Sequence, residues 1–143
     1  MLLRRSFLRG TMLAAASGAS IAFADEGENK VVYHLDDHER IAMALGNIQN
    51  HFQAFDDGGK VAIAIVVIGE ALGDFRLGDE HERTTSKLRA LVDKGLTPYA
   101  CVNTMKWLKL TLADLEPGFQ LAEKGGVVKL AELQHRGFAY IRP

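Results

Sequence analysis

The chain has almost no cysteine, because Cys101 stands alone among 143 residues. A single cysteine cannot form a disulfide within its own chain, so the stability of the fold must come from packing. In an oxidising compartment, an unpaired thiol is buried, bonded to another molecule or kept for its reactivity. The scarcity of cysteine therefore directs attention to the one that is present.

Strong net charge and long apolar runs are also missing. The formal net charge is −1, with 17 Lys and Arg against 18 Asp and Glu. The apolar stretch at residues 12–23 is interrupted by Ser17, Gly18 and Ser20 and falls short of the roughly 18–20 residues that span a bilayer. The composition thus offers no broad basic surface for nucleic acid or anionic lipid, and it disfavours an uncleaved membrane anchor.

The amino terminus is typical of an export signal. Arg4 and Arg5 open a segment Arg-Arg-Ser-Phe-Leu-Arg of the twin-arginine type, and Ala22-Phe23-Ala24 has the small-x-small form of a cleavage site. We predict a signal peptide at residues 1–24, export to the periplasm by the twin-arginine route rather than the general secretory one, and a single mature domain at residues 25–143. The mature chain keeps 14 Lys and Arg and a net charge of −4, so neither nucleic acid nor, after cleavage, a membrane is an expected partner.

Short apolar segments alternate with amphipathic ones along the mature chain. Residues 61–68 are continuously apolar and rich in β-branched side chains, which is typical of a strand covered on both faces in a parallel sheet. Further strands are expected at residues 30–35, 97–102 and 138–141, and residues 119–122 could be a short strand or a loop edge. The alternation predicts an α/β protein, a three-layer α/β/α sandwich around a mostly parallel sheet.

The helices are predicted from apolar residues at helical spacing. The first carries the stripe Ile41, Leu45, Ile48, Phe52 and Phe55, and Asp36 and Glu39 before it have the spacing of a capping box. The others are expected at residues 80–94, 103–110 and from Gly125-Gly126 to Gly137, while residues 69–78 form a loop with one helical turn. Phe75 and Trp107 are expected to serve in packing or subunit contacts.

Ligands of open α/β sheets collect where the strands end. The predicted strands place three groups there: His34, Asp36 and Asp37; Gly69 and Glu70; and Cys101, Asn103 and Thr104. Cys101 follows a strand and precedes a helix, whose amide groups, helped by Lys106, could lower the pKa of the thiol. The alternative is that Cys101 is a small buried hydrophobic residue, the commonest fate of a free cysteine.

The other candidates have structural explanations of equal weight. His34 could donate a proton or orient a ligand, or it could be a hydrogen-bonded core residue. Asp37 could act as an acid or base, or it could cap the next helix. The histidines and aspartate that might bind metal, His34, Asp37, His38 and His81, match no familiar zinc spacing, and the glycine pairs fit no phosphate-binding fingerprint. No metal or cofactor is predicted.

Four segments of the mature chain form a recognisable set: the opening KVVYHL, the strand VAIAIVVIG, the segment Cys101-Val-Asn-Thr-Met and the ending Leu-Gln-x-x-Gly-x-x-Tyr-Ile. Together they resemble the DsrE/DsrF-like family, and within it the exported, YchN-like single-domain members, over nearly all of residues 29–143. The resemblance implies a five-stranded parallel α/β/α sandwich that assembles as homotrimers or hexamers. It also implies that Cys101 occupies the position of a cysteine that sulfur-relay members use as a persulfide carrier.

Two functions of different classes follow. The first is a periplasmic sulfur-trafficking protein, a persulfide carrier of the sulfurtransferase type, in which Cys101 takes sulfur from a donor and gives it to an acceptor, with His34, Asp37, Asn103 and Thr104 shaping the pocket. The second is a non-enzymatic oligomeric protein that binds a small ligand and in which Cys101 only packs. A thiol redox role would need an external thiol, because the chain holds no resolving cysteine.

Overall fold

The computed structural model describes residues 29–56 and 60–143, and the predicted signal peptide lies outside these residues. Within them, one sheet has the strand order β4-β3-β2-β1-β5, and every neighbouring pair is parallel. The strands are β1 (Asn29–Leu35), β2 (Val61–Val67), β3 (Thr97–Cys101), β4 (Gln120–Ala122) and β5 (Ala139–Ile141). The prediction of a five-stranded parallel sheet is therefore confirmed.

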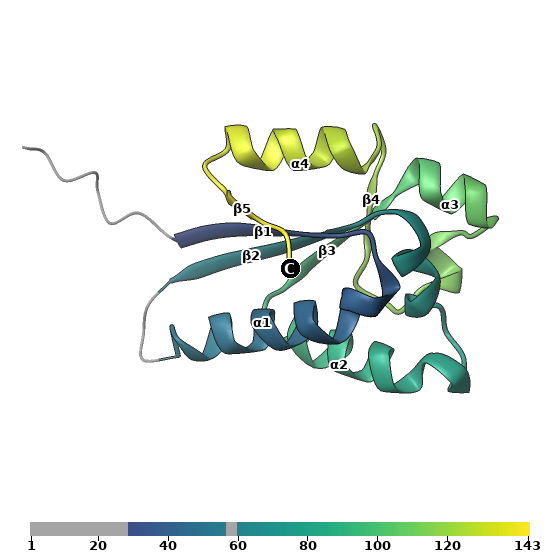
Figure 1. Ribbon diagram of the computed structural model, residues 1–143, viewed down its shortest axis with the longest axis horizontal. Coiled ribbons are helices and arrows are strands. Elements are labelled where there is room, and N and C mark those ends of the chain that lie inside the picture. Colours follow the sequence, from purple (N-terminus) through teal and green to yellow (C-terminus); the bar gives the residue numbers. More distant parts are fainter. Residues whose placement is uncertain (1–28, 57–59) are drawn as a thin grey trace, which may run out of the picture.

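Helices cover both faces of the sheet (Figure 1). They are α1 (Ile41–Gln53), α2 (Glu82–Asp93), α3 (Val102–Leu108) and α4 (Gly126–His135). Helices α1 and α2 lie on one face, α4 crosses the other, and α3 lies near the edge where the parallel strands end. This is the predicted α/β/α sandwich. In the described part of the chain, no helix is both long and apolar enough to cross a bilayer.

The core has two parts, one on each face of the sheet. Under α1 and α2, alternate residues of β1 such as Val31, Tyr33 and Leu35 pack with Ile48 and Phe75. Under α4, a smaller cluster is built on Val32, Ala64, Val66, Leu130 and Leu133. Side chains of β2 enter both clusters, which explains why its sequence is continuously apolar rather than alternating.

The ends of several elements differ from those predicted. Strand β3 ends at Cys101, and Val102 already belongs to α3, which stops at Leu108 because Lys109 adopts a left-handed conformation with φ of 56°. The loop after β2 is largely a 3₁₀ helix, η2 (Gly69–Phe75), and the ambiguous residues before Gly125 do form a strand, β4. Phe75 is fully buried, whereas Trp107 is 67% exposed and lies outside the core of this protomer.

The expected capping box at Asp36 is not formed. The 3₁₀ helix η1 (His38–Arg40) is capped instead by Asp37, whose carboxylate accepts the amide N–H of Glu39 at 2.9 Å. Asp36 points its carboxylate to Arg142, with a closest distance of 2.8 Å. The cap thus begins one residue later than the spacing indicated.

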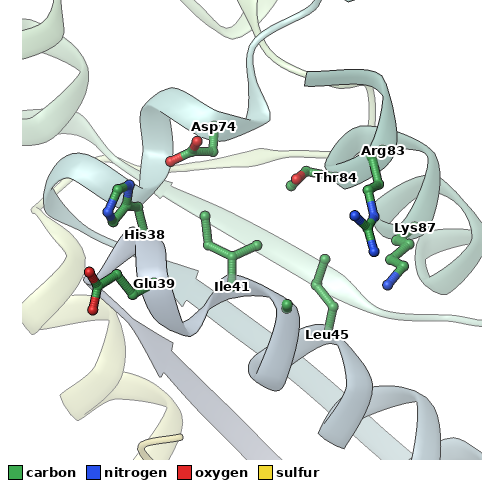
Figure 2. Close-up of a pocket in the computed structure, with 9 residues that line it drawn as sticks. His38, Glu39, Ile41, Leu45, Asp74, Arg83, Thr84 and Lys87 are labelled. Carbon is green, nitrogen blue, oxygen red and sulfur yellow. The ribbon is translucent and has the colours of Figure 1, made fainter. Parts of the chain in front are cut away.

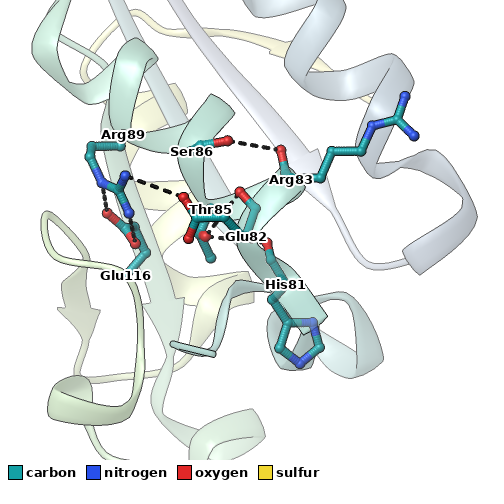
Figure 3. A network of polar contacts seen from close by, with 7 residues as sticks. All are labelled: His81, Glu82, Arg83, Thr85, Ser86, Arg89 and Glu116. Atoms are coloured by element: carbon teal, nitrogen blue, oxygen red, sulfur yellow. Dashed lines mark hydrogen bonds and ion pairs between the residues drawn. The ribbon is translucent and has the colours of Figure 1, made fainter. Parts of the chain in front are cut away.

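A buried carboxylate ties α2 to the segment before β4. Glu116 is 1% exposed, and its two oxygens accept Arg89 Nε at 2.6 Å and Nη2 at 3.0 Å (Figure 3). The Arg89 guanidinium also lies 3.7 Å from the Glu82 carboxylate. Two parallel bonds from one guanidinium give this contact a defined geometry, which fixes the approach of the chain to β4.

Candidate functional site

Cys101 lies where β3 ends and α3 begins, and its side chain is 4% exposed. Its Sγ accepts the backbone N–H of Gly126 at 3.2 Å. Gly126 is the first residue of α4, so the sulfur lies at the amino end of a ten-residue helix as well as at that of α3. Partial positive charge at helix amino ends favours a thiolate over a thiol.

The strand order brings Gly126 to the sulfur. Cys101 is paired with Ala122 of β4, and the chain turns directly afterwards, with the Gly125 amide bonded to the Ala122 carbonyl at 2.9 Å. Gly125 has φ of +97°, which glycine adopts without strain. At Gly126, an added Cβ would lie only 2.5 Å from Ile68 Cγ1, so the close approach of α4 to Cys101 depends on the absence of a side chain.

A buried hydroxyl on α3 completes the surroundings of the sulfur. Thr104 is 6% exposed, and its Oγ1 accepts the backbone N–H of Gly69, the first residue of η2, at 2.9 Å. Because this bond occupies an oxygen lone pair, the hydroxyl proton remains available for Cys101 Sγ. Three segments therefore meet at the thiol: the starts of η2, α3 and α4.

Opposing effects set the acidity of the thiol. Burial alone raises the pKa of Cys101, but the amide and hydroxyl of Thr104 act in the other direction. The amides of Gly126 and Asn103 add to them, and the pKa of the thiol falls below its ordinary value. The surroundings of Cys101 are thus those of an activated thiol rather than of a purely apolar pocket.

Of the residues predicted to help Cys101, Thr104 does so with its side chain and Asn103 with its backbone. The Asn103 side chain is exposed, and its Nδ2 lies 3.0 Å from where a Cβ on Gly125 would be. Lys106 is exposed and makes no hydrogen bond to Cys101 among the described residues. The predicted assistance from this lysine is replaced by the Gly126 amide.

His34 belongs to a different corner of the same sheet edge. It is on β1, two strands away from Cys101, which corresponds to roughly 10 Å at the usual spacing between strands. Its Nδ1 lies 2.7 Å from the hydroxyl of Tyr140, and its Nε2 lies 4.0 Å from the Asp36 carboxylate. The structure therefore does not bring His34 and Cys101 together.

Burial lowers the pKa of His34, an effect that Asp36 opposes and Arg142 reinforces. Because the unfolded chain then binds this proton more readily, the free energy of unfolding should rise with pH just below the ordinary histidine pKa of about 6.5. We expect His34→Gln to flatten that rise, as measured by urea unfolding at several pH values. Tyr140→Phe, which keeps the imidazole, should retain it. An unchanged slope in His34→Gln would contradict the assignment.

Three side chains near the end of β1 could hold a cation. Ligand atoms of Asp37, His38 and Glu70 all lie within 4.8 Å of one another. The cluster contains neither His34 nor His81, so the two predicted metal candidates that the structure brings together are Asp37 and His38. All three side chains are at least partly exposed, and exposed acidic groups commonly lie this close without an ion.

Gly126, which contacts the sulfur, was missed in the sequence, and Gly69, which was placed at a strand end, contacts the Thr104 hydroxyl. Gly126 and Gly69 act through their backbone amides, which no side-chain pattern reveals. The signal that could have found Gly126 is the pair Gly125-Gly126, which was correctly predicted to open a helix but was considered as a binding site only for phosphate. A glycine pair opening a helix beside a strand end can equally place an amide against a thiolate.

Comparison with known proteins gives neighbours in structure alone. No family model matches the chain, and no curated protein matches it. A solved protein of unknown function from Methanobacterium thermoautotrophicum is similar with a TM-score of 0.71 and 26% identity, over 81% of this chain and 100% of that one. The YchN protein from E. coli is similar with a TM-score of 0.61 and 13% identity, over 80% of this chain and 99% of that one.

A conserved protein of unknown function from Bacteroides thetaiotaomicron is similar in the same way, with a TM-score of 0.62 and 13% identity over 80% of this chain and 95% of that one. All three neighbours are covered almost from end to end, so the described domain corresponds to a whole protein in each case. At these identities a likeness carries over the fold and not the activity. The chain has a YchN-like, DsrE-like fold, with Cys101 at the carboxyl end of a central strand.

Proposed function

We propose that this protein is a sulfur carrier in which Cys101 holds a sulfane sulfur as a persulfide. The observation that carries the proposal is the convergence of the Thr104 hydroxyl and the Gly126 amide on the sulfur, which lowers the pKa of a buried thiol. A cysteine that served only to fill space would gain nothing from such donors. A nucleophilic thiolate is what a sulfur relay requires.

The chemistry needs no oxidant or reductant. The Cys101 thiolate attacks the outer sulfur of a donor persulfide or the sulfane sulfur of thiosulfate, forming a new S–S bond. The S–S bond of the donor breaks, and a thiolate or sulfite leaves with the electron pair. An acceptor thiolate then attacks the outer sulfur of the Cys101 persulfide and regenerates the Cys101 thiolate. When the Cys101 thiolate leaves in this second step, the same amide and hydroxyl donors stabilise its negative charge.

Compartment and partners belong to the same proposal. The twin-arginine segment and the Ala22-Phe23-Ala24 site support a periplasmic protein, and the homotrimer or hexamer is proposed from the sequence resemblance to the DsrE/DsrF-like family. Donor and acceptor would approach over α3 and α4, which both begin beside Cys101. Trp107 of α3 and Val127 of α4 are 67% and 72% exposed, as expected of side chains that another protein covers.

One observation favours the alternative of a ligand-binding protein in which Cys101 packs. The side chain is only 4% exposed, and Gly126 has no room for even a methyl group. Under this alternative, the folded thiol should react slowly with alkylating agents and the unfolded thiol fast. Measuring both rates separates the two functions, because an activated thiolate in the folded protein reverses the order at neutral pH.

The direct test is persulfide formation on the mature protein. After incubation with polysulfide or thiosulfate, intact mass should increase by about 32 Da per sulfur, and the increase should vanish in Cys101→Ser and on treatment with a reducing thiol. Thr104→Val removes the hydroxyl donor, so it should slow the reaction near neutral pH and approach the wild-type rate in alkaline solution. Thr104→Ser keeps the hydroxyl and serves as its control. A folded wild type that gains no sulfur from either donor contradicts the proposal.

A further inference from the structure

A hollow lies on the opposite face of the sheet from α4, between the starts of α1 and α2 (Figure 2). Its volume is about 290 Å³. The buried side chains of Ile41 and Leu45, which are 6% and 2% exposed, form part of its floor. The hollow shares no residue with the surroundings of Cys101, so it is a separate place on the molecule.

Charges of opposite sign line opposite sides of this hollow. Figure 2 shows the carboxylates of Glu39 and Asp74 beside His38 on one side, an apolar middle with Ile41 and Leu45, and the cationic Arg83 and Lys87 beside Thr84 on the other. The acidic side comes from η1 and η2, and the basic side from α2. Residues far apart in the sequence thus give the hollow one side with carboxylates and an opposite side with cationic groups.

The charged groups do not neutralise one another. No ion pair in the described part of the chain involves Glu39, Asp74, Arg83 or Lys87. Glu82, the acid in the first turn of α2, lies against Arg89 on another side of that helix. Arg83 and Lys87 also lie in the first half of α2, where the helix dipole is positive, so the helix gives them no compensation. The hollow therefore keeps an uncompensated charge at each end.

We propose that this hollow binds a small dipolar molecule, with its cationic group toward Asp74 and Glu39 and its anionic group toward Arg83 and Lys87. A short apolar spacer between the two groups lies on Ile41 and Leu45. The ligand class is that of amino acids, ω-amino acids and short peptides, whose termini carry these two charges. The Thr84 hydroxyl can donate a further hydrogen bond to a carboxylate held on the basic side. A molecule with one charge would meet only half of the site and would leave the opposite end unpaired.

The proposal is tested with the folded mature protein and a series of ω-amino acids: glycine, β-alanine, γ-aminobutyrate and ε-aminocaproate. Binding is followed by amide chemical shifts in heteronuclear NMR. We expect a saturable shift of amides around Ile41 and Thr84, with one spacer length preferred. Hexanoate and hexylamine, which match ε-aminocaproate with one charge each, should bind about two- to fivefold more weakly, since each exposed ion pair contributes modestly.

Variants assign the two ends. Lys87→Gln should weaken binding of the preferred ω-amino acid by about two- to fivefold and leave hexylamine binding unchanged. Asp74→Asn should instead weaken hexylamine binding and leave hexanoate binding unchanged. Lys94→Gln removes the same charge just beyond the end of α2 but outside this hollow, so it should leave binding as in the wild type. The amide spectra also report whether each variant is folded. The proposal is overturned if no member of the series binds, if hexanoate or hexylamine binds as tightly, or if the Lys94 variant loses affinity as much as the Lys87 variant.

Discussion

Gly126→Ala is expected to destabilise the protein by about 1–3 kcal/mol, the range for forcing extra carbon into a packed site. The new Cβ would lie 2.5 Å from Ile68 Cγ1 and 2.6 Å from its Cδ1, closer than side-chain carbons approach. We expect the start of α4 to shift to relieve this contact, which would draw the Gly126 amide away from Cys101 Sγ. The pKa of the thiol should then rise toward its ordinary value. Chemical denaturation measures the first effect, and the pH profile of alkylation measures the second.

Two further variants isolate the cause. Gly46→Ala adds the same methyl group in the interior of α1, where nothing lies within 4 Å of the new Cβ, and it should stabilise the protein by about 0.5–1 kcal/mol through helix propensity. In an Ile68→Ala background, the space for the new Cβ exists, and adding Gly126→Ala should cost less stability and restore the acidic thiol. Equal effects of Gly126→Ala in both backgrounds would show that the clash with Ile68 is not the reason.

Phe75→Ala is expected to lower the free energy of unfolding by about 3–5 kcal/mol, as for other large aromatic side chains deleted from a core. Phe75 has no exposed surface and meets Phe119 edge to face, with ring centroids 5.6 Å apart. Its backbone carbonyl also accepts the amide of Glu116 at 2.9 Å. The loss is a large share of the 5–15 kcal/mol that stabilises a typical domain. Urea denaturation at constant pH gives the difference.

Met43→Ala provides the matched control for that experiment. Met43 is a large apolar residue of α1 that is 54% exposed, and its truncation should change the stability by no more than about 0.5 kcal/mol. Phe75→Leu keeps part of the buried volume and should lie between the two. If Phe75→Ala cost no more than Met43→Ala, η2 would not be part of the cooperative core.

The strands were predictable because a strand that is buried on both faces has a continuous run of apolar residues. Residues 61–68 are all apolar, and all but the last belong to β2. The end of α3 was less predictable because Lys109 stops the helix in a left-handed conformation, which glycine usually adopts and which a lysine in the sequence does not indicate. The capping-box spacing favoured Asp36, although Asp37 was also named as a possible cap, because the two aspartates are chemically alike. In the structure, Asp37 caps η1 and Asp36 pairs with Arg142.

The candidate site was predictable to the extent that it is local in sequence. Cys101 and Thr104 are three residues apart, so a strand followed by a helix places both at one sheet edge. The Gly126 amide is 25 residues from Cys101, and its arrival depends on β4 pairing with β3. His34 was expected nearby because it also ends a strand, but the order of the strands separates it from Cys101. Shared position at a sheet edge does not fix which strand ends are neighbours.

Strand β5 comes last among the described strands, yet its partner is β1, the first of them. While the residues of β5 are still inside the ribosomal exit tunnel, β1 presents an unpaired edge and the sheet cannot be completed. The bond from Arg40 to the carbonyl of Pro143 likewise forms only after residue 143 has been made. A premature stop before Ala139 would take away all of β5 and leave that edge open to other chains. Native closure of the sheet thus reports that translation has passed β5.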